Sequence, residues 1–344
     1  RSPSDRHNTT LADVLAGFTH ARGGSRLAHV LVTGGAGYIG SHALRSILAA
    51  GHRAVVVDDL RTGRAEFVGD TPLARCDIGD TAALHRVFEE HPPFDGVLHF
   101  AASTSVPEST RQPLAYYENN TVASLRLLGA ALEYGVRAFV LSSTAAVYGN
   151  PAQLPVTEEA PCLPINPYGN SKLVFEQMLA DTAQNRELGW CALRYFNASG
   201  AEPDATLGDC RQPASHLVPA ALEAACGLRE RLELYGTDYP TPDGTCVRDY
   251  IHVTDLATAH VLALESLLAG GDSGVFNLGT GCGVSNREVI DAAERISQRS
   301  IPMIEAQRRP GDPAELVADA TRFGERFGWS PVHSSLDEIV ETAW

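Results

Sequence analysis

A glycine-rich turn between a short apolar run and an amphipathic segment constrains the fold of this chain more than any other feature. The turn runs from Gly34 to Gly40 and directly follows the β-branched run His29–Thr33. Glycines permit a tight turn, and they let a diphosphate approach the backbone N–H groups at the start of the next helix, where the helix dipole favours negative charge. The spacing G-x-x-G-x-x-G therefore predicts a dinucleotide site, with a glycine turn that binds no ligand as the alternative. The residues expected to contact the dinucleotide here are Gly34, Gly37, Tyr38, Ile39 and Gly40.

Short apolar runs and helical patterns alternate from His29 onwards. The expected strands cover residues 29–33, 53–58, 73–77, 96–100, 138–143 and 190–196. The expected helices cover residues 39–50, 81–91, 113–134 and 167–186. Strands that alternate with helices predict βαβ units, in which a parallel sheet is buried between helices. The predicted fold class is therefore α/β, with a Rossmann-type doubly wound parallel sheet.

The regular alternation stops after Asn197, which predicts a division into domains. Residues 198–248 are rich in Pro, Gly and short polar runs, and irregular segments of this kind usually carry ligand contacts. A helix over 255–268 and a strand over 275–278 then resume the α/β pattern. We expect residues 29–197 to form the dinucleotide-binding domain, with 249–283 returning to it. Residues 198–248 and 284–344 would form a smaller α/β substrate-binding domain, and residues 1–28 a poorly ordered leader.

Acidic and apolar residues end the predicted strands at the edge of the sheet where a dinucleotide would lie. Asp58 ends the second strand, and Asp59 follows it. A carboxylate there accepts a hydrogen bond from the adenosine ribose 2′-hydroxyl and repels a 2′-phosphate, which predicts NAD rather than NADP as the cofactor. Asp77 and the run Phe100-Ala101-Ala102 end the next two strands at the same edge, and we expect both to line the cofactor site. A purely structural role at the turn is the alternative for each.

Lys172 is the only lysine in the 344 residues, and it lies four residues after Tyr168. Because the chain otherwise uses Arg, the surviving Lys predicts a position that needs a compact ammonium. On a helix, residues four apart share a face, so the ammonium would reach the phenol's surroundings and favour the phenolate. Ser142-Ser143-Thr144 ends the fifth strand, where a hydroxyl would hold a substrate oxygen while Tyr168 handles its proton. Taken alone, Tyr-x-x-x-Lys is a weak pattern, and strand-end hydroxyls more often make turns.

Charge and cysteine usage exclude several classes of partner and ligand. The net charge of −15 argues against nucleic acid or an anionic membrane, since both require clustered cations. No apolar run approaches the roughly 18 residues of a membrane span. The seven cysteines are scattered and never spaced C-x-x-C, so neither a metal site nor a disulfide framework is predicted. We expect free thiols and a reducing, cytoplasmic location.

The glycine turn, Ser142–Thr144 and Tyr168-x-x-x-Lys172 occur in the order typical of extended short-chain dehydrogenases/reductases. Further segments between residues 29 and 344 narrow the resemblance to the UDP-glucose 4-epimerase family. These segments are His99–Ala102, Tyr116–Asn120, Ser142–Gly149, Leu193–Asn197, Gly236–Thr241, Arg248–Val253 and Arg308–Asp312.

The resemblance implies a reversible redox cycle on tightly held NAD. Tyr168, as phenolate, would take the proton of the sugar C4 hydroxyl while the C4 hydride moves to the nicotinamide. Lys172 and the cationic ring would lower the pKa of the phenol, and Thr144 would steady the C4 oxygen. The 4-keto sugar would then turn over in its pocket and take the hydride back on its other face. The resemblance also implies cofactor contacts from Ile78, Asn119, Ser142 and Tyr195.

The implied UDP-sugar contacts lie in the second half of the chain. Two arginines suit two phosphates, because guanidinium groups bind phosphate oxygens bidentately, although surface ion pairs are the alternative for both. The residues implied around the UDP are Asn197, Arg248, Arg309 and Asp312, with His216, Leu217 and Tyr235 near the uracil and Leu316 in the wall of the sugar pocket. The family further implies a homodimer through the helices over 113–134 and 167–186.

Some departures from the family's pattern leave alternatives open. Gly208–His216, which includes the implied uracil contact His216, stands where the family commonly carries a more acidic, His-containing stretch. The mid-sized Leu316 leaves UDP-N-acetylhexosamines and UDP-pentoses open as substrates beside UDP-galactose and UDP-glucose. A 4,6-dehydratase is disfavoured, because Ala145-Ala146 stands where related dehydratases carry an acidic pair. A catalytically silent NAD-binding sensor is the alternative from another class, but it has no reason to retain Lys172.

Overall fold

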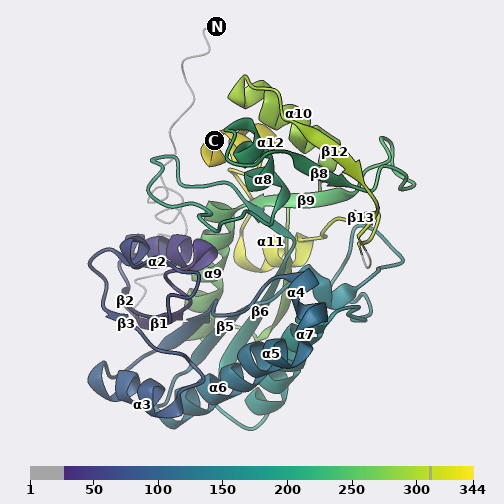
Figure 1. Cartoon of the computed structure of the whole chain (residues 1–344). Helices are drawn as coiled ribbons and strands as arrows, with labels where there is room; N and C mark the ends of the chain where they lie inside the picture. The colour runs from purple at the N-terminus through teal and green to yellow at the C-terminus, as the bar shows by residue number, and fades with distance from the viewer. Residues whose placement is uncertain (1–26, 310–311) are drawn as a thin grey trace, which may run out of the picture.

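The computed structural model describes residues 27–309 and 312–344, and the predicted leader 1–28 lies almost entirely outside the described residues. One large parallel sheet with helices on both faces forms the lower part of the molecule in Figure 1. A smaller group of helices and short strands, hereafter the second lobe, lies above it (Figure 1). Within the described residues, no helix is both long and apolar enough to cross a bilayer.

The main sheet has seven parallel strands in the order β10-β6-β5-β4-β1-β2-β3. They are β1 (His29–Thr33), β2 (Arg53–Val57), β3 (Leu73–Ala74), β4 (Gly96–His99), β5 (Ala138–Ser142), β6 (Gly189–Tyr195) and β10 (Gly274–Leu278). The order reverses at β1, which pairs with β2 on one side and with β4 on the other. Connections leave such a switch point toward opposite faces, so a crevice forms outside the carboxyl ends of the two central strands.

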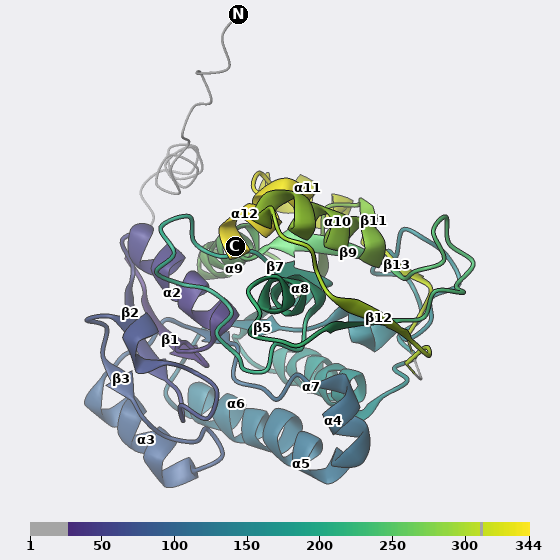
Figure 2. The same ribbon diagram turned by 45° about the horizontal axis from the view of Figure 1, so that its top comes forward.

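Helices cover both faces of this sheet and build two apolar cores (Figures 1 and 2). One face carries α2 (Tyr38–Ala49), α9 (Val253–Leu268) and α11 (Thr321–Phe327), and α2 packs against α9. The other face carries α3 (Thr81–Glu90), α6 (Ala123–Glu133) and α7 (Pro167–Ala183). Burial on both faces explains why the strands are nearly continuous runs of β-branched and other apolar residues.

The second lobe is built from two small sheets and three helices around a third core. Strand β9 (Val247–His252) pairs with β7 (Asn197–Ser199), β11 (Gly283–Ser285) and β13 (Glu315–Leu316). Strand β8 (Leu232–Tyr235) pairs with β12 (Met303–Ala306), and the helices are α8 (Leu217–Ala225), α10 (Asn286–Ser297) and α12 (Leu336–Ala343). The domain boundaries predicted above remain a prediction.

The predicted strands are present, but three predictions of local structure were wrong. The strand expected over 73–77 covers only Leu73–Ala74. The helix expected over 113–134 is preceded by α4 (Val106–Arg111) and divided into α5 (Pro113–Tyr117), a π-helical turn (Glu118–Val122) and α6. In that turn the buried Asn120 accepts a hydrogen bond from Ser103 N at 2.8 Å and donates to Ser103 O at 2.9 Å, a long-range pairing with no local signal. The segment 198–248, expected to be irregular, contains α8 and β8.

Candidate active site

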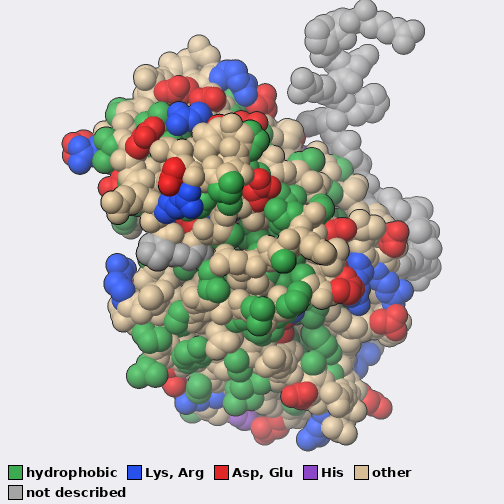
Figure 3. Space-filling model, turned by 90° about the vertical axis from the view of Figure 1, so that its right-hand side faces the viewer, with side chains coloured by type: hydrophobic (Ala, Val, Ile, Leu, Met, Phe, Trp, Pro, Cys, Tyr) green, Lys and Arg blue, Asp and Glu red, His purple; other side chains and the backbone are tan. Residues whose placement is uncertain are grey.

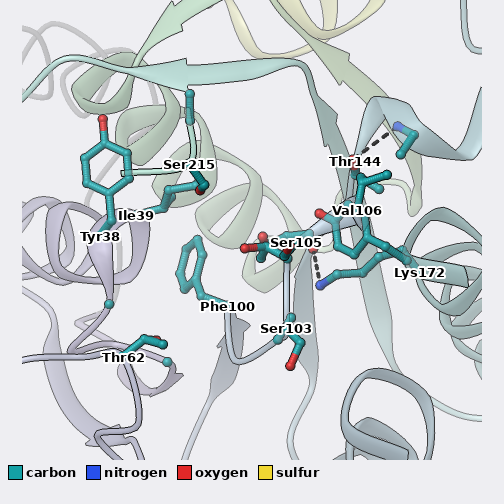
Figure 4. A pocket seen from close by; sticks show the side chains of 18 of the residues that line it. Tyr38, Ile39, Thr62, Phe100, Ser103, Ser105, Val106, Thr144, Lys172 and Ser215 are labelled. Carbon is teal, nitrogen blue, oxygen red and sulfur yellow. Dashed lines mark hydrogen bonds between the residues drawn. The ribbon is translucent and has the colours of Figure 1, made fainter. Parts of the chain in front are cut away.

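A cavity of about 730 Å³ opens between the carboxyl edge of the main sheet and the second lobe. Figure 4 shows Tyr38 and Ile39 of the glycine turn on one side of it and Thr144 and Lys172 on the other. The predicted residues that line the cavity are Gly34, Gly37, Tyr38, Ile39, Gly40, Asp58, Asp59, Asp77, Ile78, Phe100, Ala101, Ala102, Asn119, Ser142, Thr144, Tyr168, Lys172, Tyr195, Asn197, His216, Arg248, Asp312 and Leu316. One continuous cavity thus joins the predicted cofactor site to the predicted catalytic pair.

The glycine turn presents bare backbone to the cavity at the start of α2. Gly34 has φ +73°, and a Cβ there would lie 2.5 Å from Ala101 N, closer than real side chains approach. A Cβ on Gly40 would collide with the carbonyl oxygen of Gly34. Gly34 must be glycine because its φ is positive and a Cβ has no room, and Gly40 because a Cβ has no room. The turn therefore brings the N–H groups that begin α2 to the cavity wall, as a diphosphate site requires.

Asp58 is held rigidly beside the glycine turn. Its carboxylate is buried and accepts hydrogen bonds from Ala36 N at 3.0 Å and from Leu60 N at 2.9 Å. Burial raises the pKa of this carboxyl, although the two N–H donors oppose the rise. Asp59 instead pairs with Arg61, whose other branch donates to Asn119 Oδ1 at 2.7 Å. Asp58 is thus the carboxylate that the fold orients at the adenosine end of the predicted cofactor site.

Tyr168 and Lys172 lie on the first turns of α7, which begins at a well-formed cap. The Asn166 side chain accepts a hydrogen bond from Gly169 N at 2.8 Å, and Pro167 occupies the first helical position. The buried Lys172 ammonium donates to Ser142 O at 2.9 Å, and its desolvation lowers the pKa of Lys172 to about 8. Burial raises the pKa of the Tyr168 phenol. The helix therefore places both Tyr168 and Lys172 in the wall of the cavity.

Thr144 lies at the end of β5, opposite Tyr168. Its hydroxyl accepts a hydrogen bond from Ala146 N at 3.1 Å, which caps a short 3₁₀ turn (Ala145–Tyr148). The Thr144 hydroxyl also opposes the burial-driven rise in the pKa of Tyr168. The Thr144 hydroxyl is therefore fixed by the turn that it caps, beside the Tyr168 phenol in the wall of the cavity.

A buried ion pair lies next to the predicted catalytic pair, Tyr168 and Lys172. Arg194 on β6 bonds both carboxylate oxygens of Glu176, one turn beyond Lys172, at 2.5 to 3.2 Å. The Ser143 hydroxyl donates to the same carboxylate, and Arg194 Nη1 donates to Tyr148 OH at 3.0 Å. Glu176 also opposes the lowering of the pKa of Lys172. Full pairing satisfies the buried charges and fixes the positions of β5, β6 and α7 relative to one another.

The second lobe contributes polar groups at the far side of the cavity. Arg248 Nη2 lies 3.8 Å from Asp312 Oδ1, and the same guanidinium donates to Val247 O at 2.8 Å. His216 lies before α8, where burial and the nearby Arg211 lower its pKa to about 4. Positive charge in this part of the cavity at neutral pH therefore comes from arginine and not from histidine.

Three predicted substrate residues do not line the cavity. Leu217 begins α8 and packs partly against the third core. Tyr235 ends β8, and the Arg309 guanidinium lies 3.8 Å from the centre of its ring. The predicted nucleotide contacts of all three remain predictions. In the part of the chain that the structure describes, no group of His, Cys, Asp and Glu residues is placed to hold a metal ion.

Comparison with known proteins identifies the family. The model of the "NAD dependent epimerase/dehydratase family" matches residues 30–279. The chain belongs to this family. It is 53% identical over 315 residues to a UDP-glucose 4-epimerase of Azospirillum brasilense, a match that covers 91% of this chain and 90% of the relative.

Two solved structures of epimerases resemble the fold closely. A UDP-glucose 4-epimerase from Brucella ovis in complex with NAD is 47% identical, with a TM-score of 0.89 over 92% of this chain and 97% of that one. A UDP-glucose-4-epimerase from Stenotrophomonas maltophila, with bound NAD and formylated UDP-arabinopyranose, is 42% identical with the same TM-score and the same coverage.

Sequence reasoning missed several polar residues of this epimerase-family cavity. Ser103, Thr104 and Ser105 follow the predicted Phe100–Ala102 run, and Arg61 follows Asp59. All four residues could have been predicted by extending the strand-end loops that contain Asp59 and Ala102 by a few residues. Arg211 also lines the cavity, but it stands in the stretch that departs from the family's pattern, so no motif pointed to it.

Proposed function

We propose that this protein interconverts UDP-galactose and UDP-glucose by oxidation at C4, rotation of the 4-keto sugar and re-reduction, with NAD as its cofactor. The observation that carries the proposal is the single cavity. It joins a glycine turn and an oriented carboxylate to the Tyr168, Thr144 and Lys172 group, and continues to Arg248 and Asp312 in the second lobe. A dehydrogenase for a small substrate would not need this second part of the cavity with its arginine, whereas a nucleotide-linked sugar does.

The residues present fit NAD. Gly34 and Gly40 let the turn close tightly on its own backbone and on Ala101, so that Gly34, Gly37 and Gly40 line the cavity, and the N-terminus of α2 favours a diphosphate there. The oriented Asp58 carboxylate accepts hydrogen bonds from ribose hydroxyls and disfavours a 2′-phosphate. When bound, NAD supplies a reversible hydride acceptor at C4 of the sugar and a ring charge that favours ionised Tyr168.

Tyr168 acts as the base and later as the acid. As phenolate it accepts the C4 hydroxyl proton, and it returns that proton to the oxygen when the sugar is reduced again. Burial opposes the phenolate, whereas the Thr144 hydroxyl and the Arg211 guanidinium oppose this rise in the pKa of Tyr168. Lys172, one helical turn away, adds a second positive charge. Thr144 donates to the C4 oxygen from the side opposite the phenol, which keeps that oxygen in place through both half-reactions.

The second lobe holds the nucleotide while the hexose turns. Arg248 and Arg309 pair with the UDP diphosphate, and Asn197 and Asp312 hydrogen-bond the UDP. His216, Leu217 and Tyr235 lie near the uracil. Firm binding at the UDP end and few polar contacts at Leu316 leave the keto sugar free to present either face. We assign residues 198–248 and 284–344 to this task and residues 29–197 with 249–283 to NAD.

UDP-pentoses and UDP-N-acetylhexosamines are the second candidate substrates. The Stenotrophomonas structure holds a UDP-arabinopyranose derivative at 42% identity to this chain. Leu316, on β13, lines the cavity with a side chain of intermediate size, which sets the room beside the hexose. Replacement by a smaller residue would widen the pocket for a 2-acetamido group.

A homodimer through the α5–α6 and α7 helices completes the proposal. Leu114 on α5 is 82% exposed and Leu125 on α6 is 46% exposed, although both are large apolar side chains. Hydrophobic side chains also gather over the lower half of the face shown in Figure 3. A second copy that covers the α5–α6 surface would remove these side chains from water.

The seven cysteines are all free, which supports a reducing, cytoplasmic location.

The test is turnover of UDP-galactose followed by NMR. Purified protein with NAD should convert UDP-galactose into UDP-glucose until the two reach equilibrium, and should do the same from UDP-glucose. Parallel reactions with UDP-N-acetylglucosamine and a UDP-pentose rank the alternative substrates. Absence of turnover with every UDP-sugar, despite bound NAD, would refute the proposed activity.

A further inference from the structure

A segment of the second lobe, residues 200–216, crosses over the glycine turn and is tied to α2. The Tyr38 hydroxyl donates to Gly200 O at 2.6 Å, and Arg45 pairs with Asp204 at 3.2 Å. Farther along, Arg64 donates to Cys210 O at 3.4 Å. Figure 4 shows Ser215 of this crossing segment beside Ile39. The cofactor site is therefore enclosed from the side opposite the glycine turn.

Four described residues of the crossing segment line the cavity, Arg211, Pro213, Ser215 and His216, and Arg211 is the only Lys or Arg among them. Its Nε and Nη2 donate to the two carboxylate oxygens of Asp209 at 2.7 and 2.5 Å, and Nη2 lies 3.2 Å from His216 Nδ1. The guanidinium carbon lies 6.0 Å from the centre of the Tyr38 ring, and the side chain is 26% exposed. These bonds fix the direction of the Arg211 guanidinium, whereas its Nη1 has no hydrogen-bond partner among the residues that the structure describes.

The other cations of the cavity are placed elsewhere. Among the described residues that line it, the remaining Lys and Arg side chains are Arg61, Lys172 and Arg248. Arg61 pairs with Asp59, Lys172 donates to Ser142 O, and Arg248 lies near Asp312. Backbone N–H groups of the glycine turn carry only partial charge, while a dinucleotide diphosphate carries about two negative charges. The full positive charge of Arg211 would balance negative charge of the diphosphate that these N–H groups leave.

We propose that Arg211 binds the diphosphate of the cofactor from the face opposite the glycine turn, with Asp209 holding the guanidinium in position. A guanidinium that already donates two hydrogen bonds to a carboxylate keeps further N–H groups for a phosphate oxygen. This assignment rests on NAD as the cofactor of the proposed function. Arg211 belongs to Gly208–His216, the stretch that differs from the more acidic, His-containing one common in the family.

The experiment measures ligand affinity and not turnover. Arg211→Gln and the parent protein, both freed of nucleotide, are titrated by calorimetry with ADP-ribose, adenosine and UDP. Loss of one charge-assisted hydrogen-bonding group predicts about 10- to 100-fold weaker ADP-ribose binding. Binding of adenosine and UDP should stay within about 2-fold, because neither ligand carries the cofactor's diphosphate. Arg211→Lys should recover part of the lost affinity, since it restores charge without the fork.

Arg326→Gln is the matched control. Arg326 also pairs with a single aspartate, Asp272, at 2.9 Å, but it lies on α11 and does not line the cavity. Unchanged ADP-ribose affinity in a folded Arg211→Gln protein would overturn the proposal. A selective loss of UDP affinity would also overturn it, by assigning Arg211 to the substrate. Normal ADP-ribose binding by a parent protein that turns over no UDP-sugar would contradict the proposed function alone.

Discussion

Replacement of Lys172 by methionine should remove activity and stabilise the fold at the same time. Lys172 is 3% exposed, and burial lowers the pKa of its ammonium from 10.5 to about 8. A depressed pKa on a base means that the unfolded chain binds more protons, so stability rises with pH between about 8 and 10.5. Below that window the folded protein bears the full desolvation cost, which a methionine of similar length does not.

The size of the effect follows from the shift. A pKa lowered from 10.5 to about 8 corresponds to about 3 kcal/mol at pH 7, and linkage reduces this cost to about 1 kcal/mol at pH 9.5. Lys172→Met also leaves Ser142 O without its donor, a loss of about 1 kcal/mol at either pH. The variant should therefore be more stable by about 2 kcal/mol at pH 7, with the gain falling to nearly zero at pH 9.5.

Urea unfolding of nucleotide-free proteins at the two pH values measures this difference, because ligand binding would otherwise add its own stabilisation. Leu173→Met, at the neighbouring position of α7, is the control for methionine in this helix. A Lys172→Met protein that is less stable than the parent at pH 7 would refute the reasoning. So would a stability difference that does not change with pH.

Three further variants test the site. Tyr168→Phe should reduce turnover of UDP-galactose by at least about 1000-fold, because it removes the acid–base group. Calorimetry should show NAD and UDP affinities within about 3-fold of the parent. Activity within a few-fold of the parent would exclude Tyr168 as the base. Lys172→Arg keeps the charge but should lower turnover severely, because the larger planar guanidinium does not fit the buried position of the compact ammonium. Near-normal turnover would show that the single lysine has no catalytic significance. Glu176→Gln should lower the free energy of unfolding in urea by about 3 to 5 kcal/mol, because it leaves the buried Arg194 without its counter-charge. A decrease below about 1 kcal/mol would contradict the buried ion pair between Glu176 and Arg194.

The local parts of this protein were readable from its sequence. The strands of the main sheet, the glycine turn and the helix that carries Tyr168 and Lys172 follow from apolar periodicity, backbone freedom and capping residues close by in the chain. Their order along the chain is enough to predict a doubly wound sheet and a dinucleotide at its carboxyl edge, because parallel βαβ units connect with one hand.

Contacts between distant residues decided the rest. The pairing of Glu176 with Arg194, the bond from Lys172 to Ser142 O and the π-helical turn around Asn120 join residues that lie 17 to 30 positions apart. Arg211 reaches the glycine turn only because residues 200–216 fold back over α2, more than 150 positions away in sequence. Periodicity and short motifs describe neighbours within a few residues of one another, whereas burial, charge pairing and the direction of a guanidinium depend on which elements meet in space.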